Sequence, residues 1–179
     1  ESAVGGVTGT TTGGTLGSLT VSGTSAINGG SVKTTGIQTY TGAATLGAAT
    51  TLTTTNSTVT FEGALDSDDA STPRALTIST GTGDIDFDGA VGNTAALGAI
   101  TITSVASLVA DSTIDAASFT QSAGSVLTQF DGAVDLTGNF DFTGQALTLN
   151  AQLDSDGTVE VTNAGTFTTA AAGDIIADL

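Results

Sequence analysis

Apolar and polar residues alternate with a period of two along much of this chain. The alternation is clear in Ser57–Phe61, Asp84–Asp88 and Thr158–Thr162, where aliphatic or aromatic residues are separated by Thr, Asp or Glu. This pattern is typical of short β-strands with one buried and one exposed face. Gly, Asn and Asp interrupt the strands at short intervals, as turn residues do. No segment shows the apolar spacing of a helix, so the pattern predicts an all-β chain.

Two short elements recur along the chain. An aromatic-x-Gly-Ala element lies at 40–43, 61–64, 87–90 and 130–133, with a degenerate copy at 142–144. A step of one aliphatic residue followed by Thr lies at 52–53, 76–77, 100–101, 127–128 and 147–148. Successive copies are about 20–27 residues apart, which is the size of one structural unit in a solenoid.

Two all-β architectures are compatible with these patterns. An immunoglobulin-like sandwich is often anchored by a buried Trp or a Cys pair, and this chain has neither. A solenoid needs only a narrow inward stripe in each coil, which suits a chain rich in small residues. We therefore expect one domain over 1–179, a parallel β-helix (β-solenoid) with coils of about 20–27 residues. Residues 66–74, which include the only Pro, are expected to protrude as a loop, and 8–14 to form a weak first coil or a poorly ordered end.

The composition removes most catalytic chemistry. The chain has no Cys, His, Met or Trp, and Lys33 and Arg74 are its only cationic side chains. Without those residues an acyl-transfer triad or a Cys/His zinc site cannot be built. A pair of carboxylates for sugar hydrolysis would lack the aromatic residues of a sugar cleft. We expect that the protein is not an enzyme.

The net charge of −16 limits the partners of the chain. All but three of its 18 acidic residues are Asp, and no basic patch exists that could bind nucleic acid or anionic lipid. No apolar run approaches the roughly 18 residues that span a bilayer, so direct membrane insertion is not expected. The simplest role for this charge is to keep an extracellular protein dispersed. Because the chain starts at Glu1, we expect a processed or excised piece of a longer polypeptide.

The segment Ile27–Thr53 gives the chain a family resemblance. Together with Val59–Leu65 and Ile85–Val91, and more weakly to Phe167, it resembles the repeat arrays of large filamentous-haemagglutinin-like bacterial surface proteins. The resemblance implies a right-handed parallel β-helix, secretion to the cell surface, and a stalk in adhesion or aggregation. The Asn-Pro motifs of that family's secretion domain are not seen in this sequence, and no binding residue carries over.

Two groups of Asp residues are candidate calcium ligands. Asp84, Asp86 and Asp88 match the opening of an EF-hand loop, but Ala95 stands where a bidentate Glu is needed, and the alternation favours an outward row of carboxylates. Asp66, Asp68 and Asp69 lie in the expected loop, which could wrap an ion. Short acidic turns are also explained by local backbone hydrogen bonds. No cofactor is required, and calcium is the one cofactor that we consider.

Three functions stay open. The first is a structural rod of an extracellular adhesin or fibre, which holds a binding domain and its host or cell-surface ligands away from the cell. The second is a filament or surface-layer subunit, in which copies stack end to end through terminal coils such as the apolar, β-prone residues 174–179. The third is ice binding through Thr-x-Thr steps at Thr51/Thr53, Thr58/Thr60 and Thr101/Thr103. Its spacing is irregular along the sequence, with Ser79 and Asn150 at matching positions.

Overall fold

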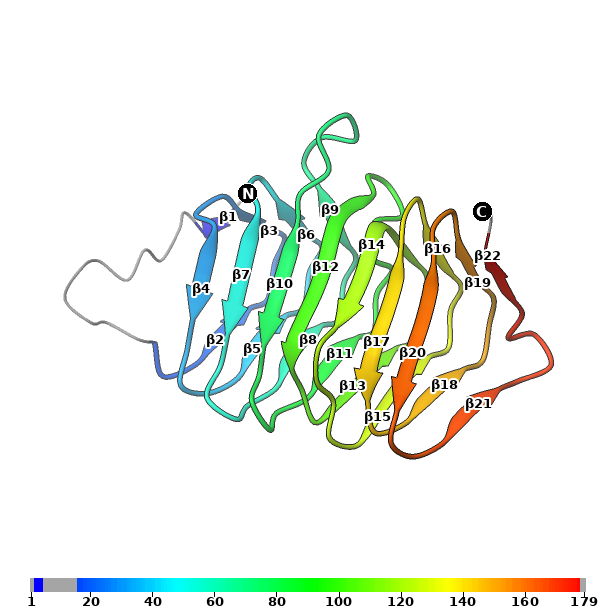
Figure 1. Cartoon of the computed structure of the whole chain (residues 1–179). Coiled ribbons are helices and arrows are strands. Elements are labelled where there is room, and N and C mark those ends of the chain that lie inside the picture. The colour runs from blue at the N-terminus through cyan, green and yellow to red at the C-terminus, as the bar shows by residue number, and fades with distance from the viewer. Residues whose placement is uncertain (1, 5–15, 178–179) are drawn as a thin grey trace.

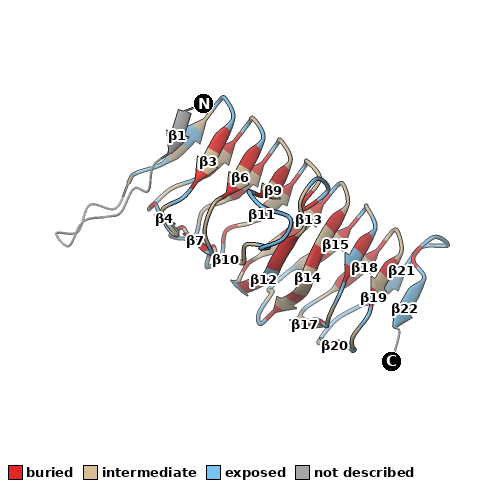
Figure 2. Ribbon diagram, turned by 90° about the horizontal axis from the view of Figure 1, so that it is seen from above, coloured by how far each residue is buried: buried red, intermediate tan, exposed pale blue. Residues whose placement is uncertain are grey.

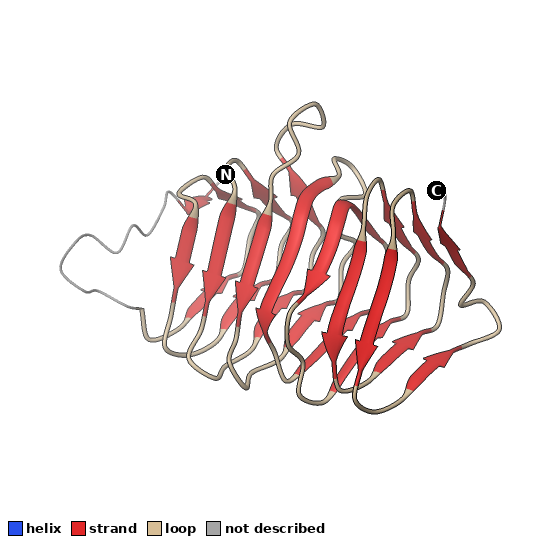
Figure 3. Cartoon of the chain, viewed as in Figure 1, coloured by secondary structure: helices blue, strands red, loops and turns tan. Residues whose placement is uncertain are grey.

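The computed structural model describes residues 2–4 and 16–177, and contains 22 short β-strands and no helix in those ranges. The Thr- and Gly-rich run at 8–14, as well as Asp178 and Leu179, lie outside the described residues. No helix that could cross a membrane is found in the described part of the chain. Figures 1 and 3 show the strands stacked side by side in a rod, with one loop standing out from it.

The strands form three faces of this rod, which the chain visits in the order III, I, II in each coil. Face I contains β1 (Ser2–Val4), β3 (Ser25–Ile27), β6 (Ala44–Leu46), β9 (Leu65–Ser67), the first part of β14 (Ile114–Gln121), β16 (Val134–Leu136), β19 (Leu153–Ser155) and β22 (Ile175–Ala177). Face II contains β4 (Ser31–Lys33), β7 (Thr50–Thr53), β10 (Leu76–Ser79), β12 (Leu97–Ser104), the second part of β14, β17 (Phe140–Gly144) and β20 (Val159–Asn163). Face III contains β2 (Leu19–Val21), β5 (Gln38–Tyr40), β8 (Val59–Phe61), β11 (Ile85–Phe87), β13 (Ser107–Ala110), β15 (Leu127–Phe130), β18 (Leu147–Leu149) and β21 (Phe167–Thr169).

Every strand pair is parallel, and each strand pairs with the same face of the next coil. The eight strands of face III mark eight coils, which confirms the predicted β-solenoid. The register along face III pairs residues that are 19 to 26 positions apart, close to the predicted repeat. The longest of these coils runs from Val59 to Ile85 and carries the protruding loop.

The interior is one continuous hydrophobic core made by alternate residues of all three faces. Most three-residue strands bury their first and third side chains and leave the middle one at the surface. Figure 2 shows this core as buried segments that run through successive coils. Each fully buried Val, Leu, Ile or Phe side chain contributes roughly 1.5–3 kcal/mol, so repeated inward positions supply most of the stability.

The aromatic-x-Gly-Ala element marks one structural position, the end of a face III strand and the corner into face I. Three of its aromatic residues stack in one inward column, with 4.7 Å between the ring centroids of Tyr40 and Phe61 and 5.8 Å between those of Phe61 and Phe87. Phe130 continues the column after Ala110. The glycine is needed because successive corners touch: a Cβ at Gly63 would lie 2.6 Å from the Gly42 carbonyl carbon. The element therefore encodes both the stack and the tight corner.

The copies of the other repeats found in the sequence do not all lie at one position of the coil. The degenerate copy at Phe142 lies in β17 on face II, where it pairs with Gln121 and Val161, so its assignment to the aromatic element was wrong. The aliphatic-Thr steps at 52–53, 76–77 and 100–101 lie on face II, whereas those at 127–128 and 147–148 lie on face III. Similar dipeptides serve different faces because every face has the same period of two.

Buried polar side chains close the corner from face II into face III. The hydroxyls of Thr34 and Thr80 donate to the carbonyls of Gly36 and Gly83 at 2.5 Å and 2.8 Å, and Thr54 bonds the Ser57 carbonyl in the same way. These residues follow the last outward residue of their face II strands, so they form an internal threonine ladder. The ladder gives hydrogen-bond partners to a corner that a purely apolar residue would leave unsatisfied.

Candidate functional site

The first predicted calcium group, Asp66, Asp68 and Asp69, does not converge on one point. Asp66 belongs to β9, and the connection that protrudes between β9 and β10 spans 68–75. The Asp66 carboxylate accepts hydrogen bonds from the backbone amides of Thr94 and Ala95 at 2.9 Å and 3.2 Å. It thus ties one coil to the next.

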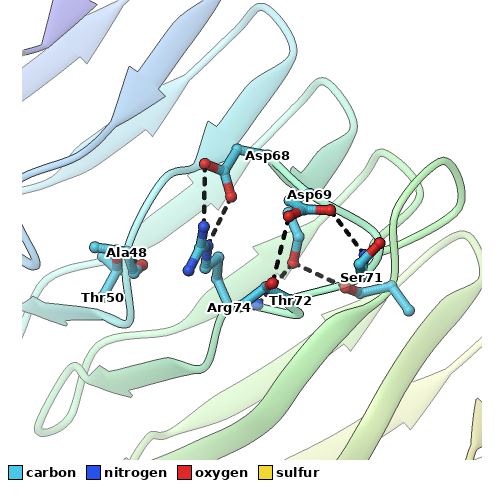
Figure 4. A network of polar contacts seen from close by, with 9 residues as sticks. Ala48, Thr50, Asp68, Asp69, Ser71, Thr72 and Arg74 are labelled. Carbon is cyan, nitrogen blue, oxygen red and sulfur yellow. Dashed lines mark hydrogen bonds and ion pairs between the residues drawn. The ribbon is translucent and has the colours of Figure 1, made fainter.

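The other two carboxylates of this group are engaged within the loop itself (Figure 4). Arg74 donates from Nε and Nη2 to the two oxygens of Asp68, at 2.6 Å and 3.3 Å, and this hydrogen-bonded guanidinium lowers the pKa of the Asp68 carboxyl. Asp69 accepts from the Ser71 amide at 2.8 Å and from the Thr72 hydroxyl at 3.3 Å. The loop is therefore held by hydrogen bonds between its own residues and closed by the ion pair of Asp68 and Arg74.

The second predicted group, Asp84, Asp86 and Asp88, lies along β11, as the alternation predicts for an outward row. Asp84 accepts the backbone amide of Ser107 in the next coil at 2.9 Å. Asp86 stands at the middle of the strand, and burial, followed by the charges of Asp84 and Asp88, raises its pKa. The three carboxylates follow a strand and do not form the loop of an EF-hand.

The corner between faces III and I carries an acidic edge that the sequence reasoning missed. Its first column consists of the residues that follow four successive face III strands, Glu62, Asp88, Asp111 and Asp131, each bonded through its amide to the preceding coil. Its second column consists of outward residues of face I, Asp66, Asp115, Asp135 and Asp154, and is interrupted at Gly92. Eight of the 18 acidic residues of the chain thus flank one corner.

The sequence contained a signal for this edge. Acidic residues four positions apart recur around an aliphatic residue, as in Glu62/Asp66, Asp111/Asp115 and Asp131/Asp135. The signal becomes meaningful only when the coil register is known, because the two members of each pair lie on different faces. Asp111 and Asp115, for example, stack on Asp131 and Asp135 of the next coil.

Burial and, after it, electrostatic repulsion raise pKa values along the acidic edge. Burial, followed by the charges of Asp111 and Glu62, raises the pKa of Asp88. Burial, followed by the charges of Asp135 and Asp66, raises the pKa of Asp115. No group of three or more Asp, Glu, His or Cys side chains in residues 2–4 and 16–177 is arranged to hold a metal ion. The edge is thus a row of like charges that favours proton uptake.

The last described coil exposes side chains whose register partners in the preceding coil are buried. Phe167 is 44% exposed and Ile175 is 40% exposed, although their register partners Leu147 and Leu153 are fully buried. In the described residues, β20, β21 and β22 pair only with the preceding coil. This end of the rod therefore presents three open strand edges around an uncovered core.

Comparisons with protein-family models, with curated proteins and with solved structures found no match for this chain. The resemblance to filamentous-haemagglutinin-like repeats stays a prediction.

Proposed function

We propose that the chain is a structural rod of an extracellular bacterial surface adhesin or fibre, which acts as a stalk or spacer in adhesion or aggregation. One observation carries this proposal: the described coils stack in parallel on one another around a single hydrophobic core. Each coil adds about 4.8 Å, so the seven register steps from Leu19 to Phe167 separate the ends of face III by about 34 Å.

The surface chemistry supports a passive role along the sides of this rod. The carboxylates of the two predicted calcium groups are engaged by the protein itself or lie in outward rows, and the acidic edge repels other copies of the chain. A spacer needs stiffness and solubility, and both are provided by the packed coils and the charge of −16. Secretion and cell-surface localisation are part of the same proposal.

A surface-display experiment tests the spacer. The chain is placed between a bacterial outer-surface anchor and a small binding domain, and capture of ligand-coated beads is compared with that of shortened rods and of a flexible Gly/Ser linker of equal residue number. We expect capture to fall stepwise as whole coils are removed, because each removed coil shortens the rod. Capture that is indifferent to coil number and equal to that of the flexible linker would contradict the proposal.

A second candidate function is end-to-end assembly through the last described coil. Phe167 and Ile175 continue inward columns, so a further coil stacked on this end would bury them and pair the open edges of β20–β22. In a filament, that coil is the first coil of another copy.

Electron microscopy of the purified chain separates the two candidates. Long uniform fibres that become short rods in a Phe167→Lys/Ile175→Lys variant support assembly, whereas short single rods from both proteins exclude it. Val126→Lys is the matched control, because Val126 is 55% exposed at a corner on the side of the rod and is not part of the last coil. Fibres that persist in the Phe167→Lys/Ile175→Lys variant would show that the last coil is not the contact.

A further inference from the structure

Face II carries a regular array of hydroxyl groups that neither the rod nor end-to-end assembly uses. The register places four threonines from consecutive coils in one outward column, Thr51, Thr77, Thr101 and Thr120. A second column, two positions further along the strands, contains Thr53, Ser79 and Ser104, with Thr103 beside the bulge between β10 and β12. We call these eight residues the hydroxyl array; its strands β7, β10, β12 and β14 lie side by side in Figure 1.

The structure shows which of the Thr-x-Thr steps, whose spacing is irregular along the sequence, lie on the same surface. Thr51/Thr53 and Thr101/Thr103 belong to the array, and Thr77 and Ser79 occupy the coil between them. Thr58/Thr60 does not belong to it, because Thr60 is an outward residue of β8 on face III. The array is therefore more regular in space than in sequence.

The first column is free to bind an external partner. None of its four hydroxyls makes a hydrogen bond to another residue within 2–4 and 16–177, whereas the second column is partly satisfied. The Ser79 and Ser104 hydroxyls are 2.9 Å apart, and Thr103 donates to the Ile78 carbonyl at 3.3 Å. Branching at Cβ restricts the rotamers of the threonines, so their methyl and hydroxyl groups repeat from coil to coil.

The array is rigid because the residues that alternate with it are fully buried. Leu52, Ile78, Ile100, Ile102 and Phe119 point inward from the same strands, and all are 0% exposed. Strands of such a sheet are about 4.7–4.9 Å apart, and alternate residues of one strand are about 6.6–6.8 Å apart. The hydroxyls thus approximate a two-dimensional lattice with a fixed repeat.

The array is also uncharged, unlike the corner between faces III and I. The nearest charged outward residues of face II lie at its two ends, where Lys33 pairs with Thr53 and Asp141 pairs with Thr120. Between these ends the outward side chains of the face II parts of the four strands are Thr, Ser and Ala, and Asp115 of β14 lies on face I. A partner must therefore be a neutral, hydrogen-bonding and periodic surface.

We propose that the hydroxyl array binds the surface of ice. Water molecules in ice form a neutral, periodic lattice of hydrogen-bond donors and acceptors, and ordered water exchanges hydrogen bonds with hydroxyls at little cost. A crystalline polysaccharide fits less well, because the array offers no aromatic side chain for a sugar ring. A second copy also fits less well: four strands cover roughly 200 Å², well below the roughly 800 Å² per partner of a stable interface. This inference does not rest on the spacer function.

Partition of the purified chain into slowly growing ice tests the inference. We expect the wild-type chain to be enriched in the ice fraction and to shape single ice crystals. Thr77→Tyr/Thr101→Tyr should lower the enrichment about tenfold, that is, by about 1.4 kcal/mol of binding free energy. Thr39→Tyr is the control, because Thr39 is an outward residue of β5 on face III and should retain the wild-type value. Circular dichroism melting shows whether all three proteins fold alike.

Three results would overturn the inference. The first is a wild-type chain that ice excludes as strongly as it excludes the Thr77→Tyr/Thr101→Tyr variant. The second is an equal loss of enrichment in the Thr39→Tyr control, which would show that any bulky substitution acts through the fold. If light scattering instead detects a dimer that only the face II variant loses, the array is a contact between copies and not an ice-binding surface.

Discussion

The aromatic column inside face III and the first column of the acidic edge are direct neighbours in the chain. Phe61 and Glu62, Phe87 and Asp88, and Phe130 and Asp131 are consecutive residues, one inward and one outward. Both columns repeat at the same strand spacing of about 4.8 Å. At that spacing, rings gain stacking and burial, whereas carboxylates gain repulsion. In a solenoid, a side chain at a repeated position recurs in successive coils, so its favourable or unfavourable effect on stability recurs as well.

The largest effect is expected from opening the aromatic column. Phe61 is fully buried between Tyr40 and Phe87, so Phe61→Ala removes two stacking contacts and leaves a cavity. We expect a loss of about 3–5 kcal/mol in the free energy of unfolding, measured by urea denaturation. Phe167→Ala in the last coil is the control and should cost much less, because that ring is 44% exposed. Equal losses at the two positions would contradict a closed column.

A smaller effect is expected at the corner that joins the two columns. A Cβ at Gly89 would overlap the backbone carbonyl of Gly63 in the preceding coil, so Gly89→Ala must displace one coil against the other. We expect about 1–3 kcal/mol of destabilisation, as for other overpacked sites. Gly23→Ala is the matched control: it lies in the same stack of corners, but a Cβ there meets no atom of the described residues within 4 Å. A neutral Gly89→Ala would show that the corners are not in close contact.

Three carboxyls with raised pKa values should make the stability of the chain respond to pH in the direction opposite to that of salt-bridged carboxylates. The folded-state pKa values of Asp86, Asp88 and Asp115 are raised, mainly by burial and then by neighbouring carboxylates. The folded chain therefore binds protons more tightly than the unfolded chain as pH falls through these values, and stability rises. We expect a higher urea midpoint near pH 5 than at pH 7. A lower midpoint at pH 5 would contradict the raised pKa values of these carboxyls.

The smallest effect is expected from removing one charge of the acidic edge. Asp88→Asn deletes the carboxylate between Glu62 and Asp111 and should raise stability by a few tenths of a kcal/mol, the range of like-charged neighbours on adjacent strands. Added salt should raise the melting temperature of the wild-type chain more than that of the variant, because salt screens the same repulsion. Asp154→Asn, at the far end of the second column, is a control with fewer acidic neighbours.

The fold could be predicted from the sequence because the four full copies of the aromatic-x-Gly-Ala element all lie at the same position of the coil. The aromatic-x-Gly-Ala element fixes the inward column and the tight corner together, so its spacing predicted the coil. The aliphatic-Thr step was less informative, since an aliphatic residue beside Thr satisfies any half-buried strand. It therefore mixed faces II and III.

The surfaces were less accessible, because they depend on register and not on local pattern. The acidic neighbours of Asp66 in the sequence predict a loop residue. Asp66 is instead in β9, where its carboxylate accepts hydrogen bonds from the amides of Thr94 and Ala95. The hydroxyl array and the acidic edge combine residues that are about 20 positions apart, and the loop at 68–75 shifts the count between coils. Only the three-dimensional stacking shows which of these residues are neighbours.

The most direct test of the stacked rod is the distance between spin labels on one outward column. The chain has no Cys, so Thr39→Cys and Thr148→Cys introduce two unique labelling sites on face III. They are five register steps apart, through Thr60, Asp86, Val109 and Gln129. Pulsed dipolar spectroscopy should give a narrow distribution of label-to-label distances. Its centre should correspond to about 24 Å between the two backbone positions, once the length of the label side chains is taken into account. A broad distribution, or one centred far from this distance, would contradict the stacked rod.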